Sequence, residues 1–433
     1  MELSQNVTTR REFLRTSAFV GSALAAPAIL SEKLFAKENS DTLRIGLIGC
    51  GGRGSGAADQ ALKADPNVVL TAMGDAFADH LQTSLKSLQT EHRDKVKVTP
   101  ENCFVGLDAY QKVIDSGVDV VLLATPPGFR PVHLKAAIDG GKHVFCEKPM
   151  ATDVPGVHSV MASAKAAKEK GLSLVAGFCW RYDAPRREFY KRIHEGAIGD
   201  IRAIYATYYA GQVKPMPAAS ERPAGMTDME WQLQNWYNFT WLSGDGFVEQ
   251  ACHSVDKVAW ALKDQPPLKA VAVGGRQTPN NQGNIFDHMF VVYEFENDVR
   301  AFIGQRQIGN TYTDNSDYLI GSDGTGKSGW TPPHLKGKKS WRYKDEGHAI
   351  NMYQQEHNEL FASIRSGKPV NDGTWMAQST LMGLMGRMAA YTGQEVTWEQ
   401  ALESKERLVP ENLDWKMHLE FPTVPVPGVT RLA

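Results

Sequence analysis

The feature that most constrains this chain is a glycine-rich turn directly after a short apolar segment. Residues 43–48 lead into Gly49-Cys50-Gly51-Gly52-Arg53-Gly54, and a helix with several alanines is predicted for 55–62. Glycine permits a tight turn, a close approach of the backbone to a phosphate, and close packing of the helix on the strand. A strand, turn and helix in this order are typical of the first βαβ unit of a parallel sheet.

An acidic residue follows at the distance that a dinucleotide site requires. Asp75 ends the second expected strand and comes 75 − 54 = 21 residues after Gly54. A carboxylate there accepts hydrogen bonds from both hydroxyls of an adenosine ribose, while the free N–H groups at the helix start bind the phosphates. We therefore predict a nicotinamide dinucleotide site formed by Asp75 together with Gly49, Gly51, Gly52, Arg53 and Gly54. The Arg53 side chain has two interpretations, a phosphate contact and a solvated position.

Two hydrophobic patterns divide the chain. Up to residue 182, short apolar runs alternate with amphipathic stretches such as 156–170, which predicts a parallel sheet with helices between its strands. The strands expected there are 43–48, 68–73, 120–124, 143–146 and 172–176. Beyond residue 182, β-branched and aromatic runs lie close together, which favours an antiparallel sheet. Its expected strands are 201–209, 269–273, 289–295 and 300–306, with helices at 356–367 and 376–391 and an extended, proline-rich tail.

These patterns predict the fold class and the domain limits. We expect an α/β Rossmann dinucleotide-binding domain at 41–182 and an α+β domain with a mostly antiparallel open sheet at 183–433. The second domain would bind the substrate. Its open sheet face and extended tail favour a homo-oligomer, either a dimer or a tetramer.

The composition excludes several classes of protein. The 47 Lys and Arg nearly balance the 49 Asp and Glu, so no global charge favours nucleic acid or an anionic membrane surface. No apolar run of about 18 residues could span a bilayer. The five cysteines contain no C-x-x-C pair, so we predict no disulfide framework and no metal site, and we interpret them as small buried hydrophobic residues.

The first 40 residues are predicted to be an export signal and a polar linker. Arg10-Arg11 precedes Phe13-Leu14 and a mildly apolar stretch, and Ala26-Pro27-Ala28 offers a cleavage site. This arrangement resembles a bacterial twin-arginine signal, which carries folded proteins out of the cytoplasm. The expected location is therefore the periplasm or beyond. The alternative is a basic N-terminal segment without a targeting role.

Two segments carry candidate catalytic groups. Lys148 follows the expected strand 143–146 at the carboxyl edge of the parallel sheet, where such folds bind ligands. In a predicted helix over 247–262, Glu249, His253 and Asp256 fall on one face. A neutral imidazole is a suitable base near pH 7, and a carboxylate one turn away can orient it. The alternatives for this face are surface ion pairing and metal ligation by Glu249 and His253.

Aromatic residues crowd the stretch before that helix. Trp231, Trp236, Tyr237 and Trp241 lie within eleven residues. Flat aromatic faces suit the C–H faces of sugar rings, and an indole N–H can donate to a hydroxyl. Core packing or a subunit contact explains such a cluster equally well.

Four segments of the sequence resemble motifs of the glucose-fructose oxidoreductase, inositol dehydrogenase and rhizopine-catabolism (Gfo/Idh/MocA) family. They are the E-K-P segment at 143–149, the T-P strand end at 124–127, the G-F-x-x-R-Y element at 177–182 and the segment 244–256. They occur in family order. The resemblance implies an enzyme that oxidises a secondary hydroxyl of a sugar, glycoside or cyclitol with NAD, or alternatively NADP.

The resemblance also implies roles for particular residues. Its catalytic group would be Lys148, His253, Glu249 and Asp256, and its cofactor contacts would include Thr125, Pro126, Glu147, Lys148 and Arg181. We assign Trp236, Tyr182 and Arg130 to the substrate. The sequence departs from the family pattern at Glu249 and Ala251, where Asp and Gly are usual, and at Pro127 and Arg130, where Asn and His are usual. The substrate therefore does not follow from the resemblance.

Two other functions fit the same motifs. The family includes NAD-dependent glycosidases, which oxidise their substrate only transiently, and the fold could also serve a non-catalytic sugar-binding protein. Lys148 and His253 favour an enzyme over the binding protein. If the chain is exported, we further expect it to retain its cofactor, because no dependable NAD pool exists outside the cytoplasm.

Overall fold

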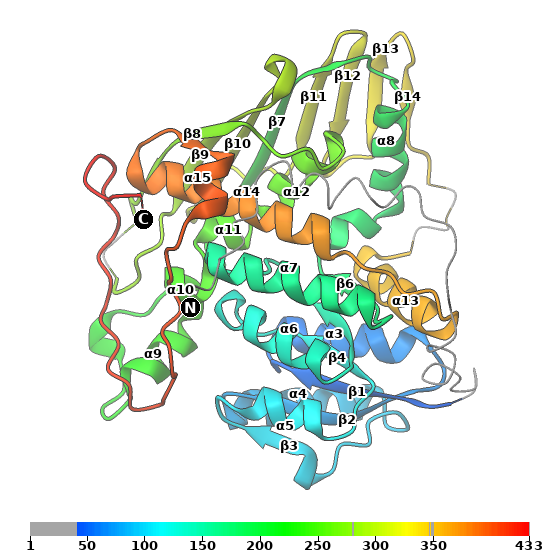
Figure 1. The fold of residues 1–433 in the computed structure, drawn as a ribbon, viewed down its shortest axis with the longest axis vertical. Coiled ribbons are helices and arrows are strands. Elements are labelled where there is room, and N and C mark those ends of the chain that lie inside the picture. Colours follow the sequence, from blue (N-terminus) through cyan, green and yellow to red (C-terminus); the bar gives the residue numbers. More distant parts are fainter. Residues whose placement is uncertain (1–40, 279–280, 346, 348–349, 433) are drawn as a thin grey trace, which may run out of the picture.

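The computed structural model describes residues 41–278, 281–345, 347 and 350–432 (Figure 1). The predicted export signal at 1–40 lies outside these residues. In the described part, no helix is long and apolar enough to cross a bilayer.

A six-stranded parallel sheet forms the lower half of the molecule in Figure 1. Its strands, in the order β3-β2-β1-β4-β5-β6, are β1 (Leu43–Ile48), β2 (Val68–Asp75), β3 (Cys103–Val105), β4 (Val120–Leu123), β5 (His143–Cys146) and β6 (Leu174–Ala176). The helices between them are α3 (Gly52–Ala64), α4 (Ala78–Glu91), α5 (Ala109–Asp115), α6 (Arg130–Asp139) and α7 (Val154–Glu169). Central strands such as β4 are buried at every position, because helices cover both faces. This order confirms the predicted Rossmann domain.

A nine-stranded sheet forms the upper half. Its order is β14-β13-β12-β11-β7-β10-β9-β8-β15, and only the central pair β7 and β10 is parallel. The strands are β7 (Ile201–Ala210), β8 (Lys269–Gly275), β9 (His288–Glu294), β10 (Arg300–Gln307), β11 (Asp317–Gly321), β12 (Gly324–Ser328), β13 (His334–Gly337), β14 (Trp341–Arg342) and β15 (Val396–Thr397). The predicted mostly antiparallel sheet is thus confirmed.

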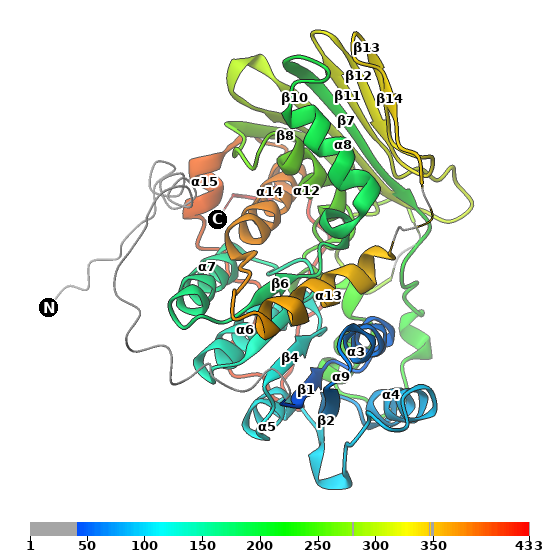
Figure 2. The same ribbon diagram turned by 90° about the vertical axis from the view of Figure 1, so that its right-hand side faces the viewer.

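Helices cover one face of this second sheet. α14 (Gly373–Thr392) packs against β8 and β9 and also against α7, so it lies between the two sheets, and α12 (Cys252–Ala261) packs on β7 (Figure 2). The opposite face carries apolar side chains in contact with solvent. Val273 is 69% exposed there, Ile320 51% and Val271 44%.

A late segment of the chain returns to the Rossmann sheet. α13 (Met352–Arg365) packs against α3 and β6 (Figure 2), and its Leu360 and Phe361 are buried in the same apolar cluster as the side chains of β1. Arg365 forms an ion pair with Asp65 at 2.7 Å. This packing joins α13 to the first half of the molecule, although the sequence assigns it to the second domain. The exact domain limits stay a prediction.

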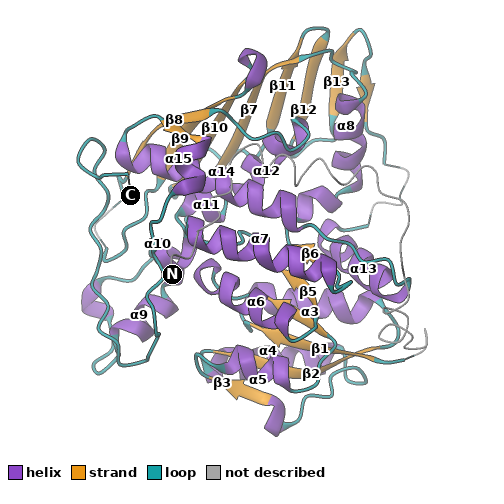
Figure 3. Ribbon diagram, viewed as in Figure 1, coloured by secondary structure: helices purple, strands orange, loops and turns teal. Residues whose placement is uncertain are grey.

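The final residues form the extended tail that the prolines predict. From 404 to 432 the chain contains neither helix nor strand and runs along one side of the molecule past α9 (Asp228–Gln234), as the teal trace in Figure 3 shows. Leu419 anchors this tail in an apolar cluster with Met229 and Leu242. All five cysteines are free, and four are buried as predicted, whereas Cys103 is only half-buried.

Candidate active site

A cavity of about 1030 Å³ runs along the carboxyl edge of the parallel sheet and extends toward the second sheet. The glycine-rich turn and the ends of β2, β4 and β5 line one part of it. The start of α12, the strand β7 and the segment around Lys214 and Trp236 line the other part. The predicted dinucleotide turn and the predicted catalytic lysine and histidine therefore share one cavity.

The glycine-rich turn has the geometry of a phosphate cradle. Gly49 adopts a φ of +92°, and a Cβ on Gly54 would lie 1.8 Å from the Gly49 carbonyl oxygen. A Cβ on Gly51 or Gly52 would meet nothing within 4 Å, so open space lies beside the start of α3. No side chain caps that helix end, which leaves its first N–H groups for a ligand. These residues fit the phosphates of a dinucleotide.

Asp75 fixes the turn and lines the cavity next to it. Its carboxylate accepts hydrogen bonds from the backbone N–H of Cys50 at 2.6 Å and of Phe77 at 2.9 Å. His80 Nδ1 lies 3.5 Å from the same carboxylate. Thr125 and Pro126 also line the cavity, and the ribose contact of Asp75 stays a prediction.

Arg53 lines the cavity beside the glycine-rich turn and is paired there with carboxylates. Its guanidinium forms ion pairs with Glu147 and, at 2.7 Å, with the fully buried Glu356 of α13. It also donates to Gln60 Oε1 at 2.9 Å. Arg53 and Glu147 both line the cavity, and their pairing ties the glycine-rich turn to the E-K-P segment and to α13.

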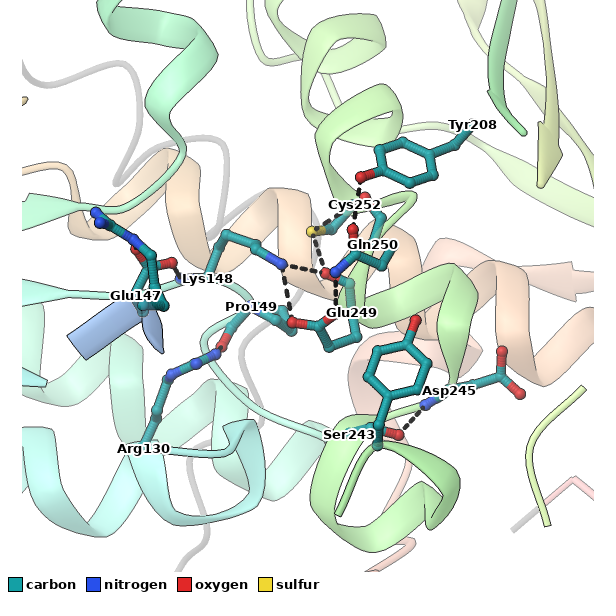
Figure 4. Close-up of polar contacts among 12 residues, drawn as sticks. Arg130, Glu147, Lys148, Pro149, Tyr208, Ser243, Asp245, Glu249, Gln250 and Cys252 are labelled. Atoms are coloured by element: carbon teal, nitrogen blue, oxygen red, sulfur yellow. Dashed lines mark hydrogen bonds and ion pairs between the residues drawn. The ribbon is translucent and has the colours of Figure 1, made fainter. Parts of the chain in front are cut away.

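Lys148 is buried against Glu249 (Figure 4). Its Nζ donates to the Glu249 carbonyl oxygen at 2.5 Å and to Glu249 Oε1 at 2.9 Å. Burial alone would lower the pKa of Lys148, but Glu249, Cys252 and Glu147 together outweigh it and raise that pKa. An ammonium has three N–H donors, so one remains for a substrate oxygen. The second Glu249 oxygen accepts from Gln250 Nε2 at 2.6 Å.

The predicted helix over 247–262 is wrong in one respect, because it is interrupted. α11 (Gly246–Glu249) ends before Gln250, and α12 begins at Cys252. The N–H of Ala251 bonds the Gly246 oxygen, five residues back, at 3.2 Å, which inserts an extra residue into the turn. The projection at 100° per residue therefore does not hold across this point, although Glu249 and His253 both line the cavity.

His253, in the first turn of α12, is a buried imidazole that lines the cavity. Its ring lies 6.0 Å from the Trp180 ring at 29°, and its Nδ1 has no hydrogen-bond partner among the described residues. Burial lowers the pKa of His253 well below its usual range, and the positive charges of Lys148, Lys257 and Arg186 lower it further. The imidazole is therefore neutral near pH 7, as a general base must be.

Asp256 does not orient His253, contrary to the prediction. Its carboxylate accepts from Arg181 Nε at 3.0 Å and from Ser379 Oγ at 2.8 Å. Arg181 in turn pairs with Asp264 and stacks on Trp375 at 4.1 Å. Neither Asp256 nor Arg181 lines the cavity, so the structure gives this pair a supporting place behind the site.

Of the three residues assigned to the substrate, two line the cavity and one does not. Trp236 and Arg130 line the cavity, and Arg130 donates from Nη1 to the Pro149 oxygen. Tyr182 is buried away from it and donates its hydroxyl to Asp372. Of the other clustered aromatics, Trp231 and Trp241 are buried core residues.

Several cavity residues were not predicted from the sequence. They are Tyr208, Trp180, Lys214, Trp330 and His133. Tyr208 lies on β7 and donates to Gln250 Oε1 at 2.5 Å. The alternation of side chains between the two faces of that strand is the sequence signal that could have pointed to Tyr208. Burial, with Arg130 close by, lowers the pKa of His133 to about 3, so this imidazole is neutral as well.

Comparison with known proteins matches both halves of the chain to one family of oxidoreductases. A family model described as "Oxidoreductase family, NAD-binding Rossmann fold" of the Gfo/Idh/MocA family matches residues 43–178, and the model of the family's C-terminal domain matches 187–327. Inositol 2-dehydrogenase 4 of Saccharopolyspora erythraea is 31% identical over 58% of this chain and 63% of its own length. The chain spans about half to two thirds of the length of the first curated relatives it matches.

Solved structures share the fold. Aldose-aldose oxidoreductase from Caulobacter crescentus matches with a TM-score of 0.63 at 17% identity, over 82% of this chain and 99% of that one. WlbA dehydrogenase from Bordetella pertussis, solved with NADH and UDP-GlcNAcA, matches with a TM-score of 0.63 at 20% identity, over 82% and 98%.

Proposed function

The chain belongs to the Gfo/Idh/MocA oxidoreductase family, with an NAD-binding Rossmann domain, and we propose that it oxidises a secondary hydroxyl of a sugar, glycoside or cyclitol. One observation carries this proposal. A paired ammonium, Lys148, and a neutral buried imidazole, His253, line the same cavity as the phosphate cradle.

The residues of the cradle fit NAD. The N–H groups at the start of α3 would hold its phosphates and Asp75 its adenosine ribose. When bound, NAD supplies the acceptor for the hydride that leaves the hydroxyl-bearing carbon. Binding, orientation and proton transfer are the work of this chain's own residues.

His253 and Lys148 divide the work on the hydroxyl group. His253 Nδ1 is buried, so Nε2 is the nitrogen that can reach a substrate, and it accepts the hydroxyl proton. The third N–H of Lys148 donates to the same oxygen and stabilises the negative charge that develops on it. Glu249 positions Lys148 in this scheme, while Asp256 and Arg181 support α12 from behind.

We also propose export through the twin-arginine pathway, on the strength of Arg10-Arg11 and the segment after it. An exported protein that released its cofactor would work once. The cofactor would then stay bound, with one sugar oxidised and a second sugar, or the same one, reduced in the same site. The name of the structurally similar aldose-aldose oxidoreductase describes chemistry of that kind.

This proposal predicts that protein purified after export retains nicotinamide cofactor through dialysis. Retention requires a dissociation constant below about 1 μM, which corresponds to more than about 8.2 kcal/mol of binding. Cofactor released by denaturation is quantified, and the untreated protein is screened with sugars and cyclitols without added NAD. Complete loss of cofactor, with an absolute need for added NAD, would contradict retention. Net hydrolysis of a glycoside without net NADH would instead favour the glycosidase chemistry.

The cradle also predicts a preference for NAD over NADP of tenfold or more. Asp75 would face the 2′-phosphate of NADP, and two unit charges about 4 Å apart repel by roughly 4 kcal/mol at an effective dielectric near 20. Each 1.4 kcal/mol is tenfold in affinity. The preference is measured as kcat/KM for both cofactors, and Asp75→Asn should reduce it. Equal values for the wild type would show that Asp75 does not face the ribose.

The open face of the nine-stranded sheet supports the proposal of a homo-oligomer. Val273, Ile320 and Val271 expose apolar surface across it. We expect a dimer or tetramer in light scattering after size exclusion, and Val273→Asp should shift the mass toward the monomer. The exposed Val213, which lies outside this sheet, provides a matched valine-to-aspartate control. A monomeric wild type at micromolar concentration would refute the assembly.

A further inference from the structure

The connection between β12 and β13 places an exposed indole at the cavity. Trp330 is 77% exposed, and it lines the same cavity as His253 and Lys148. Those two reacting groups are nearly buried, at 8% and 9% exposure. The cavity therefore continues from the reacting groups outward to an aromatic face in solvent.

The backbone just before Trp330 is held by its neighbours. A Cβ on Gly329 would lie 2.5 Å from Ser316 Oγ, so the backbone before Trp330 lies tightly against the neighbouring segment. Arg186 Nη2 donates to the Gly329 oxygen at 3.4 Å, and its guanidinium lies 3.9 Å above the Trp180 ring. Since Trp180 also stacks with His253, packed groups connect the base to the Trp330 loop.

The surroundings of Trp330 suit a polar ring. Asn315 lies beside the Trp330 loop, and the same cavity is also lined by Lys214 and Trp236, so its wall combines an amide, an ammonium and a second indole. An indole held in solvent beside such groups leaves a large apolar face unburied, and the C–H face of a sugar ring can cover it. Hydroxyl groups at the edge of that ring would find donors and acceptors on the wall.

We propose that Trp330 forms a second sugar subsite, so that the preferred substrate carries a further sugar ring beyond the ring that is oxidised. The substrate class is then a disaccharide or a glycoside of that size. This inference rests on the proposed oxidation of a sugar hydroxyl, and it adds where the unreacted part of the substrate binds.

The test compares binding of monosaccharides and disaccharides to the purified, cofactor-loaded protein. Glucose and galactose are titrated calorimetrically against maltose, cellobiose and lactose, for the wild type, Trp330→Ala, Trp330→Phe and Tyr312→Ala. Tyr312 is a matched control, because it is 72% exposed but does not line the cavity. At least one disaccharide should bind about tenfold more tightly than its monosaccharide, which corresponds to roughly 1.4 kcal/mol. Trp330→Ala should abolish this difference, Trp330→Phe should keep part of it, and Tyr312→Ala should keep all of it.

Two results would overturn the subsite. One is a panel in which no disaccharide binds more tightly than its monosaccharide, and the other is an unchanged difference in Trp330→Ala. Reduction of the bound cofactor by monosaccharides, measured in the same samples, separates this failure from that of the proposed function. A protein that oxidises monosaccharides but shows no effect at Trp330 refutes only the subsite, whereas a protein that oxidises no sugar refutes the function.

Discussion

Replacing His253 by alanine is expected to lower kcat by about 10²- to 10⁴-fold, with little change in cofactor affinity, because a positioned general base contributes that much. The burial and neighbouring positive charges that lower the pKa of His253 keep its imidazole unprotonated. The base is therefore available at neutral pH and below. The wild-type rate should fall with decreasing pH only well below pH 6.5, the usual imidazole pKa, and the variant should lose this dependence.

The control for this variant is His158→Ala. His158 lies on α7 outside the cavity, where its ring contacts the Leu402 oxygen at 2.9 Å, so its loss should leave kcat nearly unchanged. Single-turnover reduction of the bound cofactor measures the chemical step directly. A near-normal rate in His253→Ala would show that another group accepts the proton, and Tyr208, which also lines the cavity, would be the first to examine.

Lys148→Met is expected to lower kcat by a similar factor of about 10² to 10⁴, since it removes the charge that stabilises the developing alkoxide. It should also destabilise the fold. The side chains of Lys148 and Glu249 are only 10% and 7% exposed, and removing one partner of a buried pair costs about 3–5 kcal/mol. A lower melting temperature should accompany the loss of activity.

A double variant separates the two effects of this substitution. Lys148→Met with Glu249→Gln leaves no buried charge at the pair, so much of the stability should return while kcat stays low. Glu249→Gln alone should cost less activity, because Lys148 keeps its bond to the Glu249 carbonyl oxygen. Recovery of activity in the double variant would mean that Lys148 acts only through the fold.

The sequence was most informative where a pattern depends on local physics. Strand periodicity and glycine positions predicted β1, β5 and the phosphate cradle, since burial on both faces makes such strands continuously apolar. The three-residue β3 was missed because so short a run carries no periodicity. Lys148 was placed correctly at the sheet edge, but its partner Glu249 comes from a segment 101 residues later, and no local pattern encodes that pair.

The prediction that Glu249, His253 and Asp256 form one helix face assumed an uninterrupted helix. The bond from Ala251 to the oxygen five residues back interrupts the helix between Glu249 and His253, and helical periodicity contains no sign of that bond. Asp256 then meets Arg181, which approaches from the segment after β6. Trp330 and Tyr208 escaped notice for a related reason, since only the juxtaposition of the two sheets makes them walls of one cavity.

The return of α13 to the parallel sheet determines how this chain can be divided. A fragment that ends at residue 182 would lack Glu356, the buried partner of Arg53 in the nucleotide turn, and would lack Leu360 and Phe361 from its apolar cluster. The gene therefore has no single crossover point at which its two halves could be exchanged with those of a relative. A functional chimera must transfer 352–365 together with the first half, so inheritance of the nucleotide turn is coupled to a helix encoded some 300 residues downstream.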